Sequence, residues 1–164
     1  MNREVEKMLP NALRAVRTYL LQDEAKLIAY KEYDGYAANL GASIRQSGLL
    51  PALSFFTDVH KIKKNETSPR RNYLLAAILL TLGEEAIPAD KEERGRELLR
   101  RVLTAGYGAD IFKEENLNPA ITVDNPTNSE ALNTWKKRIL EATVALKLAL
   151  RTFAHSTDDH PNID

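Results

Sequence analysis

Residues 73–80 read Tyr-Leu-Leu-Ala-Ala-Ile-Leu-Leu, an apolar run that no charged side chain interrupts. A helix that is apolar on all sides must also be covered on all sides, so this run predicts a helix at the centre of a helical bundle. Ser68 and Pro69 ahead of it are typical of a helix start, and Gly83 behind it is typical of a helix end. The rest of the chain is therefore expected to pack around this segment.

Three helices are predicted before the central one. Apolar residues recur at helical spacing over about residues 10–28, where Pro10 suits a first helical turn, and again over residues 33–48. Gly48 is expected to end the second helix, and Pro51 is expected to lie in the first turn of a short third helix. The second and third helices would thus meet at a tight corner.

Two helices are predicted after the central one. Asp90 and Glu93 form a capping-box pattern ahead of an apolar stripe that runs up to Gly106. Thr127 and Glu130 form a second capping box, which opens the clearest amphipathic helix of the chain. The predicted core positions of this last helix are Leu132, Trp135, Ile139, Ala142, Leu146, Ala149 and Phe153.

The fold class that follows is all-α, a single compact bundle of about six helices over residues 1–154. Residues 106–127 contain glycines and prolines without a sustained period, so they are read as mostly loop. No segment shows a strand-like alternation strong enough to compete with the helices. The acidic tail, residues 155–164, is expected to be disordered.

The composition is that of an ordinary soluble domain. The chain has 164 residues, of which 43% are hydrophobic and 28% charged, enough for one buried core. It has no cysteine, which excludes disulfides and thiolate metal sites and favours a reducing compartment. The N-terminus does not resemble a secretory signal, and no apolar run approaches the roughly 18 residues of a membrane span. We therefore expect a cytoplasmic protein.

The net charge is zero, but the charge is distributed unevenly. Residues 1–72 carry 12 Lys and Arg against 8 Asp and Glu, residues 73–133 carry 6 against 11, residues 134–154 carry 5 against 1, and the tail carries 0 against 3. If the two positive segments meet in the fold, a basic face would coexist with an acidic one.

No catalytic constellation is visible, so the chain is not expected to be an enzyme or to need a cofactor. The tail residues His155, Asp158, Asp159 and His160 have side chains that can ligate metals. A flexible tail would lose conformational entropy on forming such a site and has no surrounding groups to orient the ligands. His60 has no evident partner for acid–base chemistry. No metal site is predicted.

The densest basic run surrounds the expected start of the central helix and consists of Lys61, Lys63, Lys64, Arg70 and Arg71. Contact with nucleic-acid phosphates is one interpretation and ordinary solvated surface is the other. Arg100 and Arg101 approach the end of a helix, where positive charge complements the helix dipole without a further role.

The last helix carries a second apolar stripe, formed by Leu140, Val144 and Leu148. A helix that is apolar on two faces is either central or meets a partner, so this stripe is a candidate protein interface.

Residues 40–55 read Leu-Gly-Ala-Ser-Ile-Arg-Gln-Ser-Gly-Leu-Leu-Pro-Ala-Leu-Ser-Phe, and this joint resembles the signature of the small helical subunit of the CRISPR type III-B, or Cmr, RNA-targeting complex. The run Trp135-Lys136-Lys137-Arg138 resembles a late tryptophan followed by basic residues in the same family. Gly41 stands where the family often has proline.

This resemblance implies a non-catalytic subunit that acts in antiviral defence. It implies several copies stacked along the other Cmr subunits and contacting guide and target RNA mainly through phosphates. Arg45, Lys136, Lys137 and Arg138 are the basic positions that the resemblance itself supplies. A helical protein–protein interaction module without nucleic-acid contact is the alternative.

Overall fold

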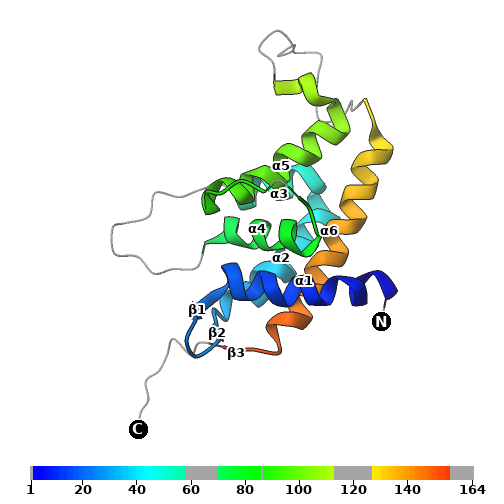
Figure 1. Cartoon of the computed structure of the whole chain (residues 1–164). Coiled ribbons are helices and arrows are strands. Elements are labelled where there is room, and N and C mark those ends of the chain that lie inside the picture. The colour runs from blue at the N-terminus through cyan, green and yellow to red at the C-terminus, as the bar shows by residue number, and fades with distance from the viewer. Residues whose placement is uncertain (1, 58–69, 86, 113–126, 156–164) are drawn as a thin grey trace.

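The computed structural model describes residues 2–57, 70–85, 87–112 and 127–155, and within these ranges helices dominate (Figure 1). The helices are α1 (Arg3–Tyr19), α2 (Glu32–Ser47), α3 (Leu49–Thr57), α4 (Arg71–Thr81), α5 (Lys91–Tyr107) and α6 (Ser129–Leu150), with a 3-10 turn, η1 (Ala109–Phe112), after α5. The strands are β1 (Leu21–Asp23), β2 (Ile28–Ala29) and β3 (Ala154–His155). The predicted all-α fold of about six helices is confirmed. Among the described residues, no helix combines the length and apolar character that crossing a membrane requires.

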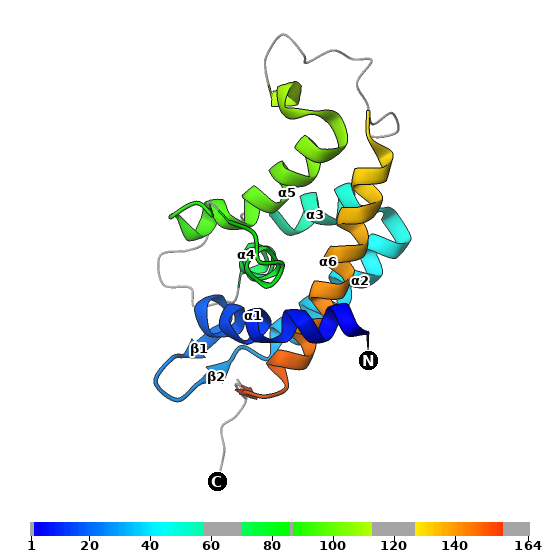
Figure 2. The same cartoon turned by 45° about the vertical axis from the view of Figure 1, so that its right-hand side comes forward.

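Helix α4 is the centre of the structure, as its sequence predicts. Every side chain from Leu74 to Leu79 has 0% exposure. Helices α1, α5, α6 and α3 all pack against it, and Figure 2, which looks nearly along α4, shows it between α1 and α5. Burying this run on all sides removes its apolar surface from water, which requires the other helices to pack around it.

Helix α1 differs from its prediction at both ends. It begins at Arg3, because the side chain of Asn2 accepts a hydrogen bond from the backbone N–H of Glu4 at 2.8 Å and caps the first turn. Pro10 therefore lies inside the helix at an exposed position and not in its first turn. The helix ends at Tyr19, nine residues short of the expected end at residue 28.

Residues 21–29 form a hairpin where the sequence predicts helix. The side chain of Asp23 accepts the N–H of Lys26 at 3.1 Å, and Leu27 has a positive φ of 55°, so the chain reverses here. Strand β2 then pairs with β1 on one side and in parallel with β3 on the other. The predicted helix is therefore wrong over residues 21–28. The strands are too short to show an alternating pattern, and β3 comes from the far end of the chain. The fold thus includes His155, and the rest of the tail lies outside the described residues.

The corner between α2 and α3 matches its prediction. Gly48 ends α2 with a φ of 96°, a left-handed conformation that favours glycine, and α3 follows at once. Near the start of α2, the buried hydroxyl of Tyr33 donates to the carbonyl oxygen of Arg70 at 3.0 Å and accepts from the N–H of Arg70 at 3.1 Å. Burial raises the pKa of Tyr33 well above its ordinary value, so the neutral phenol keeps the proton that it donates. This pair of hydrogen bonds fixes the start of α4 against α2.

The joint between α5 and α6 corrects two further expectations. Helix α5 runs past Gly106 to Tyr107. Gly106 instead lies against Leu132, whose side chain fills the space that a Cβ would need. Asn128, not Thr127, caps α6 by accepting the N–H of Ala131, while the Thr127 hydroxyl donates to the carbonyl oxygen of Gly106 at 3.0 Å. The close approach at Gly106 therefore joins the two helices.

A glycine on α5 should be indispensable for its packing on α4. A Cβ on Gly95 would lie 2.4 Å from the backbone carbonyl oxygen of Asn72, so Gly95→Ala must push the two helices apart. We expect the free energy of unfolding to fall by about 1–3 kcal/mol in urea denaturation followed by circular dichroism. Gly35→Ala is the matched control, because no atom lies within 4 Å of the new methyl group and alanine favours the helix. Equal stability of the two variants would contradict this packing.

Candidate nucleic-acid interface

Three arginines of α5, Arg96, Arg100 and Arg101, are paired with glutamates. Arg101 holds Glu97 at 2.9 Å on the same helix and Glu84, in the segment after α4, at 3.3 Å. Glu84 in turn lies 3.8 Å from the guanidinium of Arg138 on α6. These pairs connect α5 with α6 and are partly shielded, since Arg101 and the two glutamates each expose less than a quarter of the side chain.

The network continues along the exposed face of α5. Arg100 lies 3.8 Å from Glu97 and 3.0 Å from Glu93, and Glu93 also pairs with Arg96 at 2.6 Å. Pairs as exposed as these contribute little to stability, typically up to about 1 kcal/mol each. Their main effect is to hold the guanidinium groups in fixed positions and to neutralise them within the protein.

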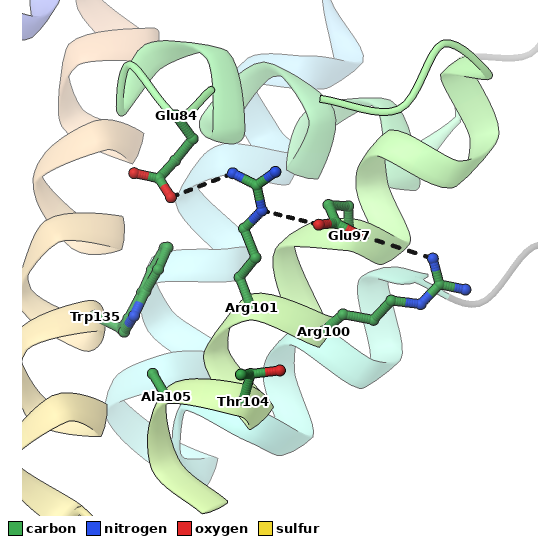
Figure 3. A pocket seen from close by; sticks show the side chains of 7 residues that line it. All are labelled: Glu84, Glu97, Arg100, Arg101, Thr104, Ala105 and Trp135. Carbon is green, nitrogen blue, oxygen red and sulfur yellow. Dashed lines mark hydrogen bonds and ion pairs between the residues drawn. The ribbon is translucent and has the colours of Figure 1, made fainter. Parts of the chain in front are cut away.

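A surface hollow of about 430 Å³ lies at this network, between α5 and α6 (Figure 3). Trp135 forms one wall, and the guanidinium of Arg138 lies 5.5 Å from the centroid of its ring. The complete lining is Glu84, Glu97, Arg100, Arg101, Thr104, Ala105 and Trp135.

Two of the predicted phosphate-binding residues have structural contacts at the start of α4. Arg70 pairs with Glu92, and its guanidinium lies 5.6 Å from the ring centroid of Tyr73. Arg71 stacks on Phe55, with its guanidinium carbon 4.3 Å from the ring centroid. Both arginines thus hold α4 to its neighbours. Lys61, Lys63 and Lys64 lie outside the described residues.

The basic positions of the predicted signature divide into two kinds. Arg138 is committed within the protein, because it donates to the backbone carbonyl oxygen of Leu82 at 3.2 Å in addition to its contact with Glu84. Arg45 and Lys137 are exposed and Lys136 is half-buried, and none of these three pairs with a carboxylate in the part of the chain that the structure describes. Helix α2 packs against α6, so Arg45 and the two lysines lie on neighbouring helices.

Sequence reasoning missed the hollow. It treated Arg100 and Arg101 as partners of the helix dipole, whereas the structure places them beside Trp135, a residue more than thirty positions further along the chain. The spacing of Glu97 and Arg101 by four residues was a usable signal for a helical ion pair, but nothing local indicates that α6 completes the lining.

The described residues contain no cluster of three or more His, Cys, Asp or Glu side chains that could hold a metal ion. His155 lies within 2.9 Å of the backbone carbonyl oxygen of Leu150 through its Nε2, which ties the ring to the end of α6. Asp158, Asp159 and His160 of the tail, and His60, lie outside the described residues.

Comparison with known families gives one match over residues 6–109, to the family described as CRISPR-associated protein (Cas_Cmr5). The chain belongs to this family. It is thus a small subunit of the CRISPR type III-B Cmr complex, alongside other subunits. Comparison with curated proteins and with solved structures gave no match.

The matched part of this Cmr subunit contains the joint at residues 40–55 and one side of the hollow. It ends before α6, so Trp135 and the basic run after it lie beyond the match. The length of the match, more than half of the chain, establishes the family independently of that late tryptophan.

The second apolar stripe of α6 is only partly at the surface of the subunit. Val144 is 41% exposed, but Leu140 and Leu148 are half-buried and pack against the core. Both leucines therefore have a structural role, and Val144 is the residue of the three that is available to a partner.

Substitution by aspartate should separate these roles. Leu148→Asp places a carboxylate against the core, so we expect the free energy of unfolding to fall by about 2 kcal/mol. Val144→Asp, the matched change on the same helix, should alter it by less than about 0.5 kcal/mol. Urea unfolding of both variants measures the difference. A stable Leu148→Asp variant would show that the whole stripe is free surface.

Proposed function

We propose that this Cmr subunit is non-catalytic and contacts guide and target RNA through phosphates. It acts in the cytoplasm, in antiviral defence, with several copies stacked along the other subunits. The observation that carries the proposal is the division of its cations. Arg96, Arg100 and Arg101 of α5 are neutralised by glutamates, whereas Arg45, Lys136 and Lys137 have no carboxylate partner among the described residues.

Unpaired cations suit contact with RNA backbone for a simple reason. A lysine or arginine that already holds a carboxylate must give up that contact, or share it, to hold a phosphate, whereas an unpaired one releases only counterions. Arg45 lies in the last turn of α2, and the two lysines lie on α6, which packs against α2. Cations on adjacent helices can contact neighbouring phosphates of one strand, and no base-specific reading is needed for such contacts.

The lysine-rich segment adds to the same proposal. Lys61, Lys63 and Lys64 fall between the end of α3 at Thr57 and the start of α4 at Arg71. The density of positive charge in this segment is the only reason for assigning these lysines to RNA. Arg70 and Arg71 are no longer strong candidates, because removing either also removes contacts that hold α4.

A protein-docking module without RNA contact is the second candidate. It is favoured by exposed apolar side chains, of which Val144 at 41% and Leu13 at 37% are examples on the two packed helices α6 and α1. The two functions respond differently to salt, because phosphate contacts weaken steeply as salt rises and apolar contacts do not.

Neutralising Arg45, Lys136 and Lys137 should weaken RNA binding and its salt dependence together. For the variant Arg45→Gln, Lys136→Gln, Lys137→Gln, the slope of log K against log salt should become less steep by about 2, since each lost contact with single-stranded RNA removes about 0.7. Fluorescence anisotropy with a labelled single-stranded RNA, measured over a range of salt concentrations, gives both slopes.

The matched control neutralises three other exposed cations, Arg14, Lys26 and Lys91, on α1, on the hairpin and at the start of α5. It changes the net charge by the same amount as the first variant. Its plot of log K against log salt should stay nearly as steep as that of the parent chain. If both variants lost the same part of the salt dependence, net charge alone would explain the effect. If the parent chain does not bind RNA even at low salt, the docking module is favoured.

A further inference from the structure

The hollow between α5 and α6, called the slot below, is bounded on one side by the flat ring of Trp135. In Figure 3 the indole of Trp135 is seen nearly edge-on, with a face turned toward the side chains of α5. Arg101 and Thr104 lie across from it, and Ala105 leaves room at the base because its side chain is a single methyl group. Arg138 lies 5.5 Å from the centroid of the indole without lining the hollow, so it supports the ring from outside.

Two polar groups in the slot are open to a hydrogen-bonding ligand. The hydroxyl of Thr104 has no hydrogen-bond partner in the described parts of the chain, although the hydroxyls of other helical threonines, Thr18, Thr81 and Thr134, each donate to the carbonyl oxygen four residues before. The indole N–H of Trp135 also lacks an acceptor within those parts. An apolar side chain in the slot would remove water from both groups and offer no hydrogen bond in its place, which is unfavourable.

The charges around the slot exclude a cation as its occupant. Glu84 is held by Arg101 and Arg138, and Glu97 by Arg100 and Arg101, so neither carboxylate is left unpaired. Arg100 lines the slot with 44% of its side chain exposed, and its guanidinium is likewise paired, with Glu93 at 3.0 Å and Glu97 at 3.8 Å.

We infer that this slot binds one unpaired nucleobase of a single-stranded RNA. The base stacks on the face of Trp135, and its polar edge meets the Thr104 hydroxyl. A nucleobase suits this site because it is flat and has hydrogen-bonding atoms at its edge. The inference rests on the proposed RNA-binding function and adds a base contact to its phosphate contacts.

The test compares two ligands of equal length and charge, a single-stranded oligoadenylate and an abasic ribose-phosphate oligomer. Trp135 is the only tryptophan of the chain, so its fluorescence reports on the slot alone. Oligoadenylate should quench this emission and the abasic oligomer should not. Oligoadenylate should also bind about 5- to 150-fold more tightly, the ratio that corresponds to one stacked base.

Variants of the full chain assign the preference to the slot. Trp135→Leu should reduce the ratio of the two affinities to below about 2 while the abasic oligomer still binds, and Trp135→Phe should retain much of it. Thr104→Val keeps the shape and loses the hydroxyl, so it should lower the ratio about 2- to 10-fold. Phe112→Leu is the control, because Phe112 is an exposed aromatic residue outside the lining. It should change nothing.

Each other outcome is decisive. Equal binding of both ligands by the parent chain, with unchanged emission, overturns the base contact and leaves the phosphate contacts standing. Failure of both ligands to bind at low salt overturns the proposed function and this inference together. A Trp135→Leu chain that keeps its preference for oligoadenylate but no longer assembles with the other Cmr subunits would show that the slot takes a side chain of a partner protein.

Discussion

The burial of α4 on every side is the constraint on which the structure depends. Its side chains from Leu74 to Leu79 have no contact with water, so α1, α3, α5 and α6 must each present an apolar face to it. Two approaches are especially close. Tyr33 fixes the start of α4 through both backbone groups of Arg70, and Gly95 brings α5 against the backbone of Asn72. Neither position tolerates a different geometry without moving the central helix.

The same packing decides which charges are available at the surface. Because α5 lies against α4 with its apolar side, Arg96, Arg100 and Arg101 share the outer side with Glu93 and Glu97 and are neutralised by them. The network then extends through Glu84 to Arg138 and holds α6 beside α5. A segment rich in arginine is thereby made unsuitable for strong contact with phosphate, while the less conspicuous Arg45 and Lys137 remain unpaired in the described chain.

The family match and the structure give complementary views of the subunit. The match covers residues 6–109 and thus the central helix and its closest neighbours, where packing limits what can change. Helix α6 lies outside it and supplies both the unpaired lysines and the tryptophan wall of the hollow. The parts proposed to meet RNA are therefore divided between the matched core and a helix that the match does not reach.

The sequence by itself determined the helical class, the central position of α4 and the corner at Gly48, because each follows from local periodicity or from a glycine conformation. It also pointed to the family through residues 40–55. Tertiary structure alone decided that residues 21–29 form a hairpin, that Arg70 and Arg138 are engaged inside the protein, and that Trp135 faces the α5 arginines. The reason is physical: strand pairing, ion pairing and concave surfaces depend on residues distant in the chain, and a sequence pattern records only what its near neighbours favour.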